Sequence, residues 1–268
     1  MSRSTRTTLR FALPSSLGDA EARSHEVAAY FKAVLHKDVE VVATPSYEQL
    51  ARELLAGKID AAWAPPFVCA RIEAMGVRVL VRGVRSGASV YRAALICKRE
   101  SHRTLETLTG ATAAWSDRDS IGGFLLPMAL LREKGLDPSK TFQKQEFVGN
   151  YRAAMEAVFG GKAEVTSVFA PSAKVAGAAE LTGAHEIWPE QAQAFRVLAW
   201  TDEAPNDGVA VSMSASTSTV SDLEKTLLSM HQSAEGLKVL GDCFHAEKFE
   251  VAPRMGYRAL YRVALASL

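Results

Sequence analysis

The chain has 268 residues, of which 48% are hydrophobic and 23% are charged, an ordinary composition for a globular protein of one large or two small domains. Its formal net charge of +1 gives no electrostatic argument for a nucleic-acid partner or a membrane surface. The three cysteines and six histidines show neither disulfide nor metal-binding spacings, and no apolar run has the length of a membrane span, so we expect no metal, no other cofactor and no membrane span.

The N-terminal residues 1–16, MSRSTRTTLRFALPSS, are basic but contain no apolar segment of the length found in signal peptides. The sequence as given therefore predicts a cytoplasmic protein, and a periplasmic one if a signal sequence has been removed. It carries no indication of the oligomeric state.

Hydrophobic runs and helical spacings alternate along the chain. Residues 9–13 predict a first strand, and residues 21–35 repeat apolar side chains at helical spacing. Ser46 and Gln49 form a capping box for a helix that ends at Gly57. Further strands are expected at residues 39–43, 59–64, 77–84, 91–98, 142–148, 163–169, 195–200 and 208–212, and further helices at residues 124–132, 150–159, 223–233, 235–240 and near 257–265. This alternation is typical of an α/β fold with a mostly parallel sheet.

The stretch from residue 115 to residue 138 combines a strand end, a polar loop with glycines and a helix. Ser120 is a suitable N-cap, and Gly122 and Gly123 let the backbone approach another group closely. A helix N-terminus offers unpaired N–H groups and the positive end of the helix dipole, so this stretch is a candidate anion site. The alternative is an ordinary capped helix that binds nothing.

Residues 46–67 and 150–171 repeat each other weakly, with a constant offset of 104 positions and no gap. The repeat favours two similar α/β lobes that each place a tyrosine at a helix N-terminus and present their strand ends to one cleft. The alternative is that any succession of cap, helix, glycine and strand looks alike. The matching pairs are Ser46 with Asn150, Tyr47 with Tyr151, Gly57-Lys58 with Gly161-Lys162, and Asp60 with Glu164.

Several short motifs occur in a characteristic order along the chain. They are Tyr47-x-x-Leu50, Gly57-x-Ile59-Asp60-x-Ala62-Trp63 and Pro66, then Asp117 with Ser120, Gly123, Phe124, Leu125 and Pro127, then Gly135-Leu136-Asp137-Pro138, Asn206-Asp207 and Tyr257. In these motifs the chain, over roughly residues 9–261, resembles the phosphate-, phosphite- and phosphonate-binding proteins of ABC transporters. The resemblance implies a type II periplasmic-binding-protein fold, in which two α/β lobes joined by two hinge strands close on a ligand. The implied lobes are residues 1–93 with 209–268, and residues 94–208.

The loop that holds the oxyanion departs from the family pattern. Where the family has Ser-Thr-Ser-Gly, this chain has Ser120-Ile121-Gly122-Gly123, so two of the three hydroxyl donors are absent. Tyr151 stands where the family commonly has a histidine, and Phe169 stands near the place of an acidic residue that often binds a ligand amine. Because a buried oxyanion needs several donors, these changes weaken the case for a phosphonate and leave a weaker anion, such as a carboxylate, as an alternative.

No catalytic constellation is evident, since the sequence has no nucleophile elbow, no P-loop and no evident acid–base pair. The candidate ligand-binding residues therefore come from the anion loop and from the resemblance. For Trp63 the alternative is a core tryptophan, for Asp207 a turn residue, and for the tyrosines ordinary packing. The candidates are Ser15, Tyr47, Trp63, Tyr91, Ser120, Ile121, Gly122, Gly123, Tyr151, Phe169 and Asp207.

The sequence therefore predicts a substrate-binding protein for a small, anionic ligand, with an ABC permease as the partner that the resemblance implies. One alternative is a cytosolic enzyme on the same fold, similar to proteins of the menaquinone or thiamine pathways. The effector domain of a transcription regulator is less favoured, because no helix-turn-helix pattern precedes residue 9.

Overall fold

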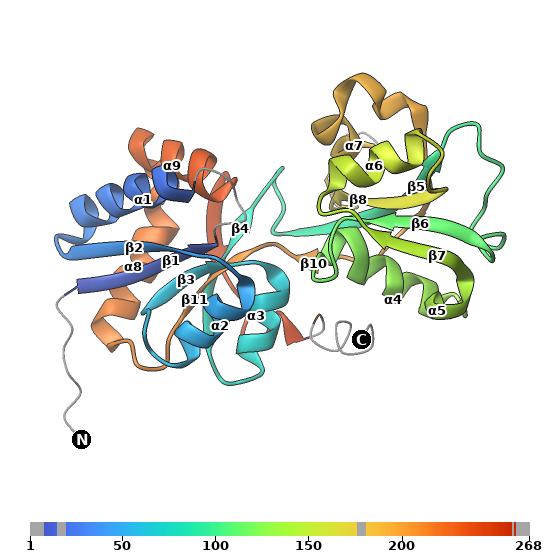
Figure 1. The fold of residues 1–268 in the computed structure, drawn as a ribbon. Helices are drawn as coiled ribbons and strands as arrows, with labels where there is room; N and C mark the ends of the chain where they lie inside the picture. The colour runs from blue at the N-terminus through green and yellow to red at the C-terminus, as the bar shows by residue number, and fades with distance from the viewer. Residues whose placement is uncertain (1–7, 15–19, 176–180, 259, 261–268) are drawn as a thin grey trace. The chain divides into compact units, whose positions relative to one another are not determined.

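The computed structural model describes residues 8–14, 20–175, 181–258 and 260, and the chain folds into two compact units (Figure 1). Unit 1 contains the described residues up to Ser89 and from Pro205 onward, and unit 2 contains Val90–Ala204. The expected lobe boundaries, at residues 93 and 208, lie a few residues further along the chain. Each unit is an α/β layer structure with its own sheet and core.

Unit 1 is built on a mixed sheet with the strand order β12-β4-β11-β3-β1-β2. β1 pairs in parallel with β2 and β3, whereas β11 is antiparallel to β3 and β4, and β12 is antiparallel to β4. The expectation of a mostly parallel sheet is therefore wrong, because only strands joined by a helical crossover must run in parallel. The strands span Thr8–Pro14 (β1), Asp38–Thr44 (β2), Ala61–Ala64 (β3), Arg78–Val84 (β4), Gly208–Val211 (β11) and Lys248–Val251 (β12).

Helices cover both faces of this sheet. Figure 1 shows α1 and α9 on one face and α2 and α3 on the other. Serine N-caps begin three of the helices, and the predicted cap Ser46 accepts a hydrogen bond from the Gln49 N–H at 3.1 Å. The helices are Ala20–Leu35 (α1), Tyr47–Leu55 (α2), Pro66–Glu73 (α3), Thr217–Ser229 (α8), the 3₁₀ turn Met230–Gln232 (η4) and Ala234–Phe244 (α9).

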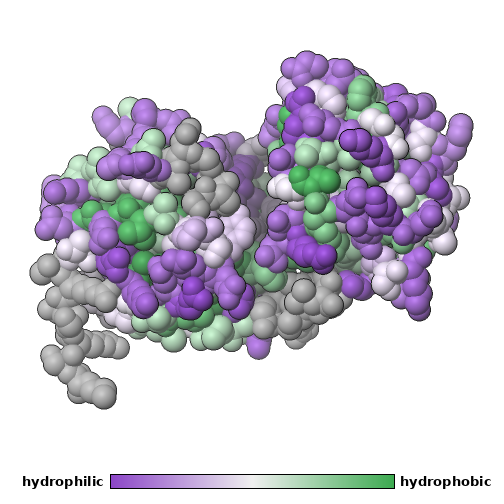
Figure 2. All heavy atoms as spheres, in the orientation of Figure 1, coloured by the Kyte–Doolittle hydropathy of each residue, from purple (hydrophilic) through white to green (hydrophobic). Residues whose placement is uncertain are grey.

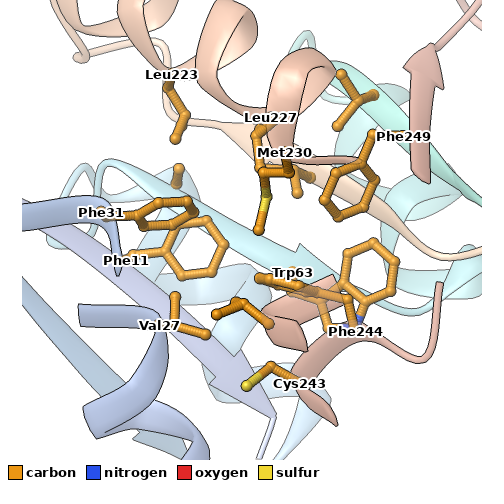
Figure 3. Packing of buried hydrophobic residues seen from close by; sticks show 14 of the residues in the cluster. Phe11, Val27, Phe31, Trp63, Leu223, Leu227, Met230, Cys243, Phe244 and Phe249 are labelled. Carbon is orange, nitrogen blue, oxygen red and sulfur yellow. The ribbon is translucent and has the colours of Figure 1, made fainter. Parts of the chain in front are cut away.

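The hydrophobic core of unit 1 is rich in aromatic side chains (Figure 3). Trp63 of β3 is 2% exposed, and its ring packs edge-on against Phe244 and Phe249 at centroid distances of 5.3 and 5.6 Å. Phe11 packs edge-on against Phe31 in the same cluster. The structure therefore places Trp63 in the core, which was the alternative to a pocket wall, because its side chain packs with residues of α1, α8 and α9 on one face of the sheet.

Unit 2 is also built on a mixed sheet, with the order β10-β5-β8-β6-β7 and with β9 paired to β5. β6 is parallel to β7 and β8, and β5 is antiparallel to β8 and β9. The parallel strands β6 and β8 therefore place their carboxyl ends at the same edge of the sheet. The strands span Val90–Lys98 (β5), Ala111–Trp115 (β6), Phe142–Phe147 (β7), Val165–Pro171 (β8), Phe195–Trp200 (β9) and Ala204–Pro205 (β10).

Two hydrophobic clusters flank the sheet of unit 2, one under α6 and α7 and the other under α4. Figure 1 shows these helices on opposite faces. The helical segments are Ile121–Leu125 (η2, a π-helical turn), Leu126–Glu133 (α4), Pro138–Thr141 (α5), Tyr151–Phe159 (α6), Thr182–Ile187 (α7) and the 3₁₀ helix Pro189–Ala194 (η3).

The sequence did not predict the short elements α3, α5, α7, η3 and β12. Pro66 and Pro138 are each the first residue of a helix, where proline is favoured because no N–H is needed. The expected helix near residues 257–265 lies mostly outside the described residues, and the candidate Ser15 also lies outside them.

Hydrophilic residues cover most of the face shown in Figure 2, and hydrophobic residues form only small patches on it. The exposed large hydrophobic side chains come from separate elements, for example Met75 after α3 and Leu237 on α9. Such scattered exposure is normal for a folded protein. Within the described residues, no helix combines the length and the apolar character needed to cross a bilayer.

Candidate functional site

The loop after β6 in unit 2 carries the predicted anion site. Ser120 caps the following helix, and its Oγ accepts a hydrogen bond from the Gly123 N–H at 3.1 Å. The carbonyl oxygen of Ser120 accepts from the N–H groups of both Phe124 and Leu125 at 3.0 Å. The helix therefore begins with the wide π-helical turn η2 before it continues as α4.

The first N–H groups of η2 have no hydrogen-bond partner among the described residues. The N–H groups of Ile121 and Gly122 form no hydrogen bond with any other described residue. Both residues lie at the N-terminal end of a continuous helical segment, η2 and α4, where the helix dipole favours negative charge. This arrangement is suited to binding an anionic group.

Two tyrosines and a phenylalanine surround Gly122. A Cβ atom added to Gly122 would lie 3.0 Å from Tyr151 Oη, 3.3 Å from Tyr91 Cε2 and 3.8 Å from Phe169 Cα. Tyr151 packs edge-on against Phe169, and its Oη lies 3.3 Å from Ser120 Oγ. The structure therefore brings together seven of the predicted site residues within unit 2, namely Tyr91, Ser120, Ile121, Gly122, Gly123, Tyr151 and Phe169. Glycine at position 122 leaves the room that Tyr151 and Tyr91 fill.

Two serines that the sequence reasoning missed support this loop. Ser167 of β8 donates a hydrogen bond from its Oγ to the carbonyl oxygen of Gly122 at 2.7 Å. Ser116, the first residue after β6, is 3% exposed and lies against Gly123. A serine inside the buried strand β8 was a signal that could have been noticed, because a buried hydroxyl needs a partner.

The donors that lie together at this site, the N–H groups of Ile121 and Gly122 and the hydroxyls of Ser120 and Tyr151, are uncharged. The Arg118 guanidinium lies over the ring of Phe147 at 4.3 Å, and Arg152 is bound to Glu156 at 2.8 Å. Affinity for an anion would therefore come from N–H and O–H groups and from the helix dipole.

The remaining predicted site residues belong to unit 1. Tyr47 is the first residue of α2 and is half-buried. The carboxylate of Asp207 forms an ion pair with Arg85 at 2.6 Å. A ligand role for Tyr47 or Asp207 stays a prediction, and Trp63 belongs to the core.

Asn206 and Tyr257, from the motifs quoted above, have a structural role in unit 1. The Tyr257 hydroxyl donates to the carbonyl oxygen of Asn206 at 2.7 Å, and the Asn206 amide donates to the carbonyl oxygen of Gly83 at 3.0 Å. Burial, together with the nearby Cys69 and Asp207, raises the pKa of Tyr257, so its hydroxyl stays protonated and donates.

The comparisons with known proteins identify the family. The family model described as "ABC transporter, phosphonate, periplasmic substrate-binding protein" matches residues 12–257. This match spans most of the chain and is independent of the site geometry described above.

Solved structures of similar proteins have the same fold. A Xanthomonas citri protein bound to ATP aligns with a TM-score of 0.82 and 18% identity over 98% of both chains. A binding protein component of an ABC phosphonate transporter from Pseudomonas aeruginosa aligns with a TM-score of 0.74 and 18% identity, over 98% of this chain and 87% of that chain. PhnD1 from Prochlorococcus marinus, in complex with methylphosphonate, aligns with a TM-score of 0.75 and 13% identity, over 98% of this chain and 99% of that chain.

At these identities the structural likenesses establish the fold alone, a two-sheet α/β fold of the type II periplasmic-binding-protein class. The family model establishes more, because it covers the chain from β1 to the segment after β12. The chain therefore belongs to the family of periplasmic substrate-binding proteins of phosphonate ABC transporters.

Proposed function

We propose that this protein binds a small organic anion through the loop of residues 116–123 in unit 2 and delivers it from the periplasm to an ABC permease. The N–H groups of Ile121 and Gly122, which have no partner in the part of the chain that the structure describes, are the observation that carries the proposal. The hydroxyls of Ser120 and Tyr151 lie beside them and add donors for the same anionic group. Membership of the family supports the periplasmic location and the permease as partner.

The aromatic side chains around Gly122 contact the rest of the ligand in this proposal. Tyr91 and Phe169 are half-buried, so part of each ring is open to a bound molecule. The acidic residue that often binds a ligand amine in the family has no counterpart at Phe169. We therefore favour a ligand without an amine at this position, either an organophosphonate such as methylphosphonate or a small carboxylate.

The proposal is of a binding protein, not an enzyme. A nucleophilic serine needs a general base within hydrogen-bond reach. Within the described residues, the Ser120 hydroxyl pairs with Tyr151 and the Gly123 N–H, and with no histidine or carboxylate. Nothing in the comparisons favours the enzyme alternative.

A thermal-shift screen tests the ligand class. The probes are inorganic phosphate, phosphite, methylphosphonate, acetate and benzoate, because a ligand that binds the native state raises the melting temperature by mass action. A shift with methylphosphonate supports the family ligand, and a shift with the carboxylates alone supports a changed specificity. No shift with any anion would contradict the proposal.

Ser120→Ala tests the place of binding. The substitution removes both a helix cap and a donor to the anion, so the affinity for the best probe should fall by about tenfold. Ser216→Ala is a matched control, because Ser216 Oγ caps α8 with a hydrogen bond of the same length, 3.1 Å, and α8 carries none of the predicted site residues. Calorimetric affinities that are equal in the two variants would remove Ser120 from the site.

A further inference from the structure

The Ser116 hydroxyl is buried and has no partner in the described part of the chain. The residue is 3% exposed, and its Oγ forms no hydrogen bond with any other described residue. Buried hydroxyl groups in folded proteins nearly always have a partner, and an unpaired one lowers stability. The unpaired hydroxyl lies in the loop proposed to hold the anion, so a role during ligand binding would explain it.

The Ser116 hydroxyl lies next to that of Ser120. A Cβ atom on Gly123 would overlap Ser116 Oγ and would lie 2.7 Å from Ser120 Oγ, so both hydroxyls occupy the side of Gly123 that lacks a side chain. Rotation about a single side-chain bond is enough to turn a serine hydroxyl toward its neighbour. Only glycine fits at position 123, because any side chain would displace one of the two serines.

The hydroxyls of the described structure cannot all donate to a ligand at the same time. Ser120 Oγ accepts from the Gly123 N–H and shares a hydrogen bond of 3.3 Å with Tyr151 Oη. Whichever of the two hydroxyls donates in this pair, one of their two protons is used between them. While this hydrogen bond is in place, Ser120 and Tyr151 together therefore offer a ligand at most one proton.

We propose that Ser116 donates its proton to Ser120 Oγ when the anion binds and so takes the place of Tyr151. Ser120 then accepts from Gly123 and Ser116, and it donates its own proton to the anion. Tyr151 is released to donate its proton to a second oxygen of the same anion. Ser116 is thus a positioning residue that acts through Ser120, and this inference rests on the proposed function of the loop.

The mechanism favours a ligand with at least two acceptor oxygens on one anionic group. Two hydroxyl protons and two N–H groups, those of Ile121 and Gly122, then converge on that group. A carboxylate or a phosphonate has enough acceptor oxygens for these four donors, whereas a halide ion offers a single atom. Ile121 and Gly122 stand where the family has hydroxyl side chains, so this chain has fewer donors. The additional proton from Tyr151 compensates for part of that loss.

The chain offers a matched control in Thr166. Its Oγ1 is also buried and without a partner among the described residues, and it lies on β8 in the same unit. Successive side chains of a strand point to opposite faces, so Thr166 faces away from Ser167, which contacts Gly122. Removal of the Thr166 hydroxyl therefore tests an unpaired buried hydroxyl outside the site.

The test measures stability and affinity together in Ser116→Ala and Thr166→Val. Both variants should keep or raise the melting temperature of the ligand-free protein, because each removes an unpaired buried hydroxyl. Calorimetry with methylphosphonate, inorganic phosphate and acetate should show about three- to tenfold weaker binding for Ser116→Ala alone. Thr166→Val should bind as the wild type does.

A double-mutant cycle with Tyr151→Phe distinguishes positioning from packing. Without a Tyr151 proton to release, Ser116→Ala should weaken binding by less than twofold in this background. An equal loss in both backgrounds would overturn the inference, as would unchanged affinity of Ser116→Ala in an otherwise binding-competent protein. A wild-type protein that binds none of the three probes would instead overturn the proposed function itself.

Discussion

The segments α2–β3 of unit 1 and α6–β8 of unit 2 share one local design. Ser46 and Asn150 cap the two helices through side-chain hydrogen bonds of 3.1 and 2.8 Å to the third residue beyond. Gly57 and Gly161 follow the helices with φ values of +66° and +74°, a conformation that favours glycine. The offset of 104 positions in the sequence therefore corresponds to the same local conformation in the two units.

The acidic residues of the repeat also have the same role. Asp60 accepts a hydrogen bond from the N–H of Arg10 on β1, and Glu164 accepts one from the N–H of Thr112 on β6. The N–H groups of the two acids donate back to the carbonyl oxygens of the same partners. Each acid thus links the strand after the helix to the first parallel strand of its unit.

The two segments differ in the strands that follow. Trp63 and Ser167 occupy equivalent positions, 104 residues apart, but Trp63 packs in an aromatic core and Ser167 holds the carbonyl oxygen of Gly122. The shared design positions a strand, and one side chain on that strand decides whether it supports a core or a binding loop. We therefore predict that substitution of Trp63 changes mainly the stability of the protein, whereas substitution of Ser167 also changes ligand binding.

The largest expected effect is on stability, through Trp63. Trp63→Ala should lower the free energy of unfolding by about 3–5 kcal/mol, because the contacts with Phe244 and Phe249 are lost and a cavity remains. Urea unfolding measures this loss. Trp63→Phe is the milder variant, and it should keep the wild-type affinity for the best anionic probe. If Trp63→Phe kept the native stability but lost affinity for the probe, Trp63 would be part of the ligand pocket and not only of the core.

A smaller loss of stability and a clear loss of affinity are expected at Ser167, the position equivalent to Trp63. Ser167→Ala leaves the carbonyl oxygen of Gly122 without its partner, which should cost about 1–3 kcal/mol of stability. The loop that carries the N–H donors would then be held less firmly, so binding should weaken by about three- to tenfold, as measured by calorimetry. If Ser167→Ala were to bind as tightly as Thr166→Val, the contact would not support the site.

The sequence predicted most of the regular framework, because caps and glycines act locally. Ser46 and Ser120 were identified as N-caps from residue type alone, and both cap their helices in the structure. Sheet direction was not predicted correctly, because β11 and β12 enter the sheet of unit 1 without a helical crossover from their neighbours. Pairing between segments far apart in the chain leaves little trace in local patterns.

The candidate site was predicted in part, for the same reason. Ser120, Gly122 and Tyr151 were expected from motifs and lie together in unit 2. Ser116 and Ser167 were not expected, because their roles depend on contacts made by the folded loop. The core position of Trp63 also depends on contacts with α9 and β12, which follow it by more than a hundred residues.

The smallest expected effect is a difference between Glu164 and Asp60 variants in how the free energy of unfolding depends on pH. Burial alone would raise the pKa of Glu164, but hydrogen bonds from the Arg103 side chain and the Thr112 N–H together lower it. Glu164→Gln should therefore cost about 0.5–1 kcal/mol at pH 7, since the ion pair with Arg103 is partly exposed. The difference from the wild type should shrink below pH 4.5, the usual pKa of a glutamate, as the pH falls through the lower pKa of the folded state.

Asp60→Asn is the matched control for this prediction, because Asp60 binds the equivalent backbone N–H and has no ion pair among the described residues. Arg103→Gln should reproduce the pH dependence of Glu164→Gln, since either substitution removes the same charge pair. Urea unfolding between pH 3 and pH 7 measures all three variants. If Asp60→Asn showed the same pH dependence, the effect would come from the backbone hydrogen bond that both units share. If only Glu164→Gln and Arg103→Gln showed it, the effect would come from the ion pair that unit 2 adds to the shared design.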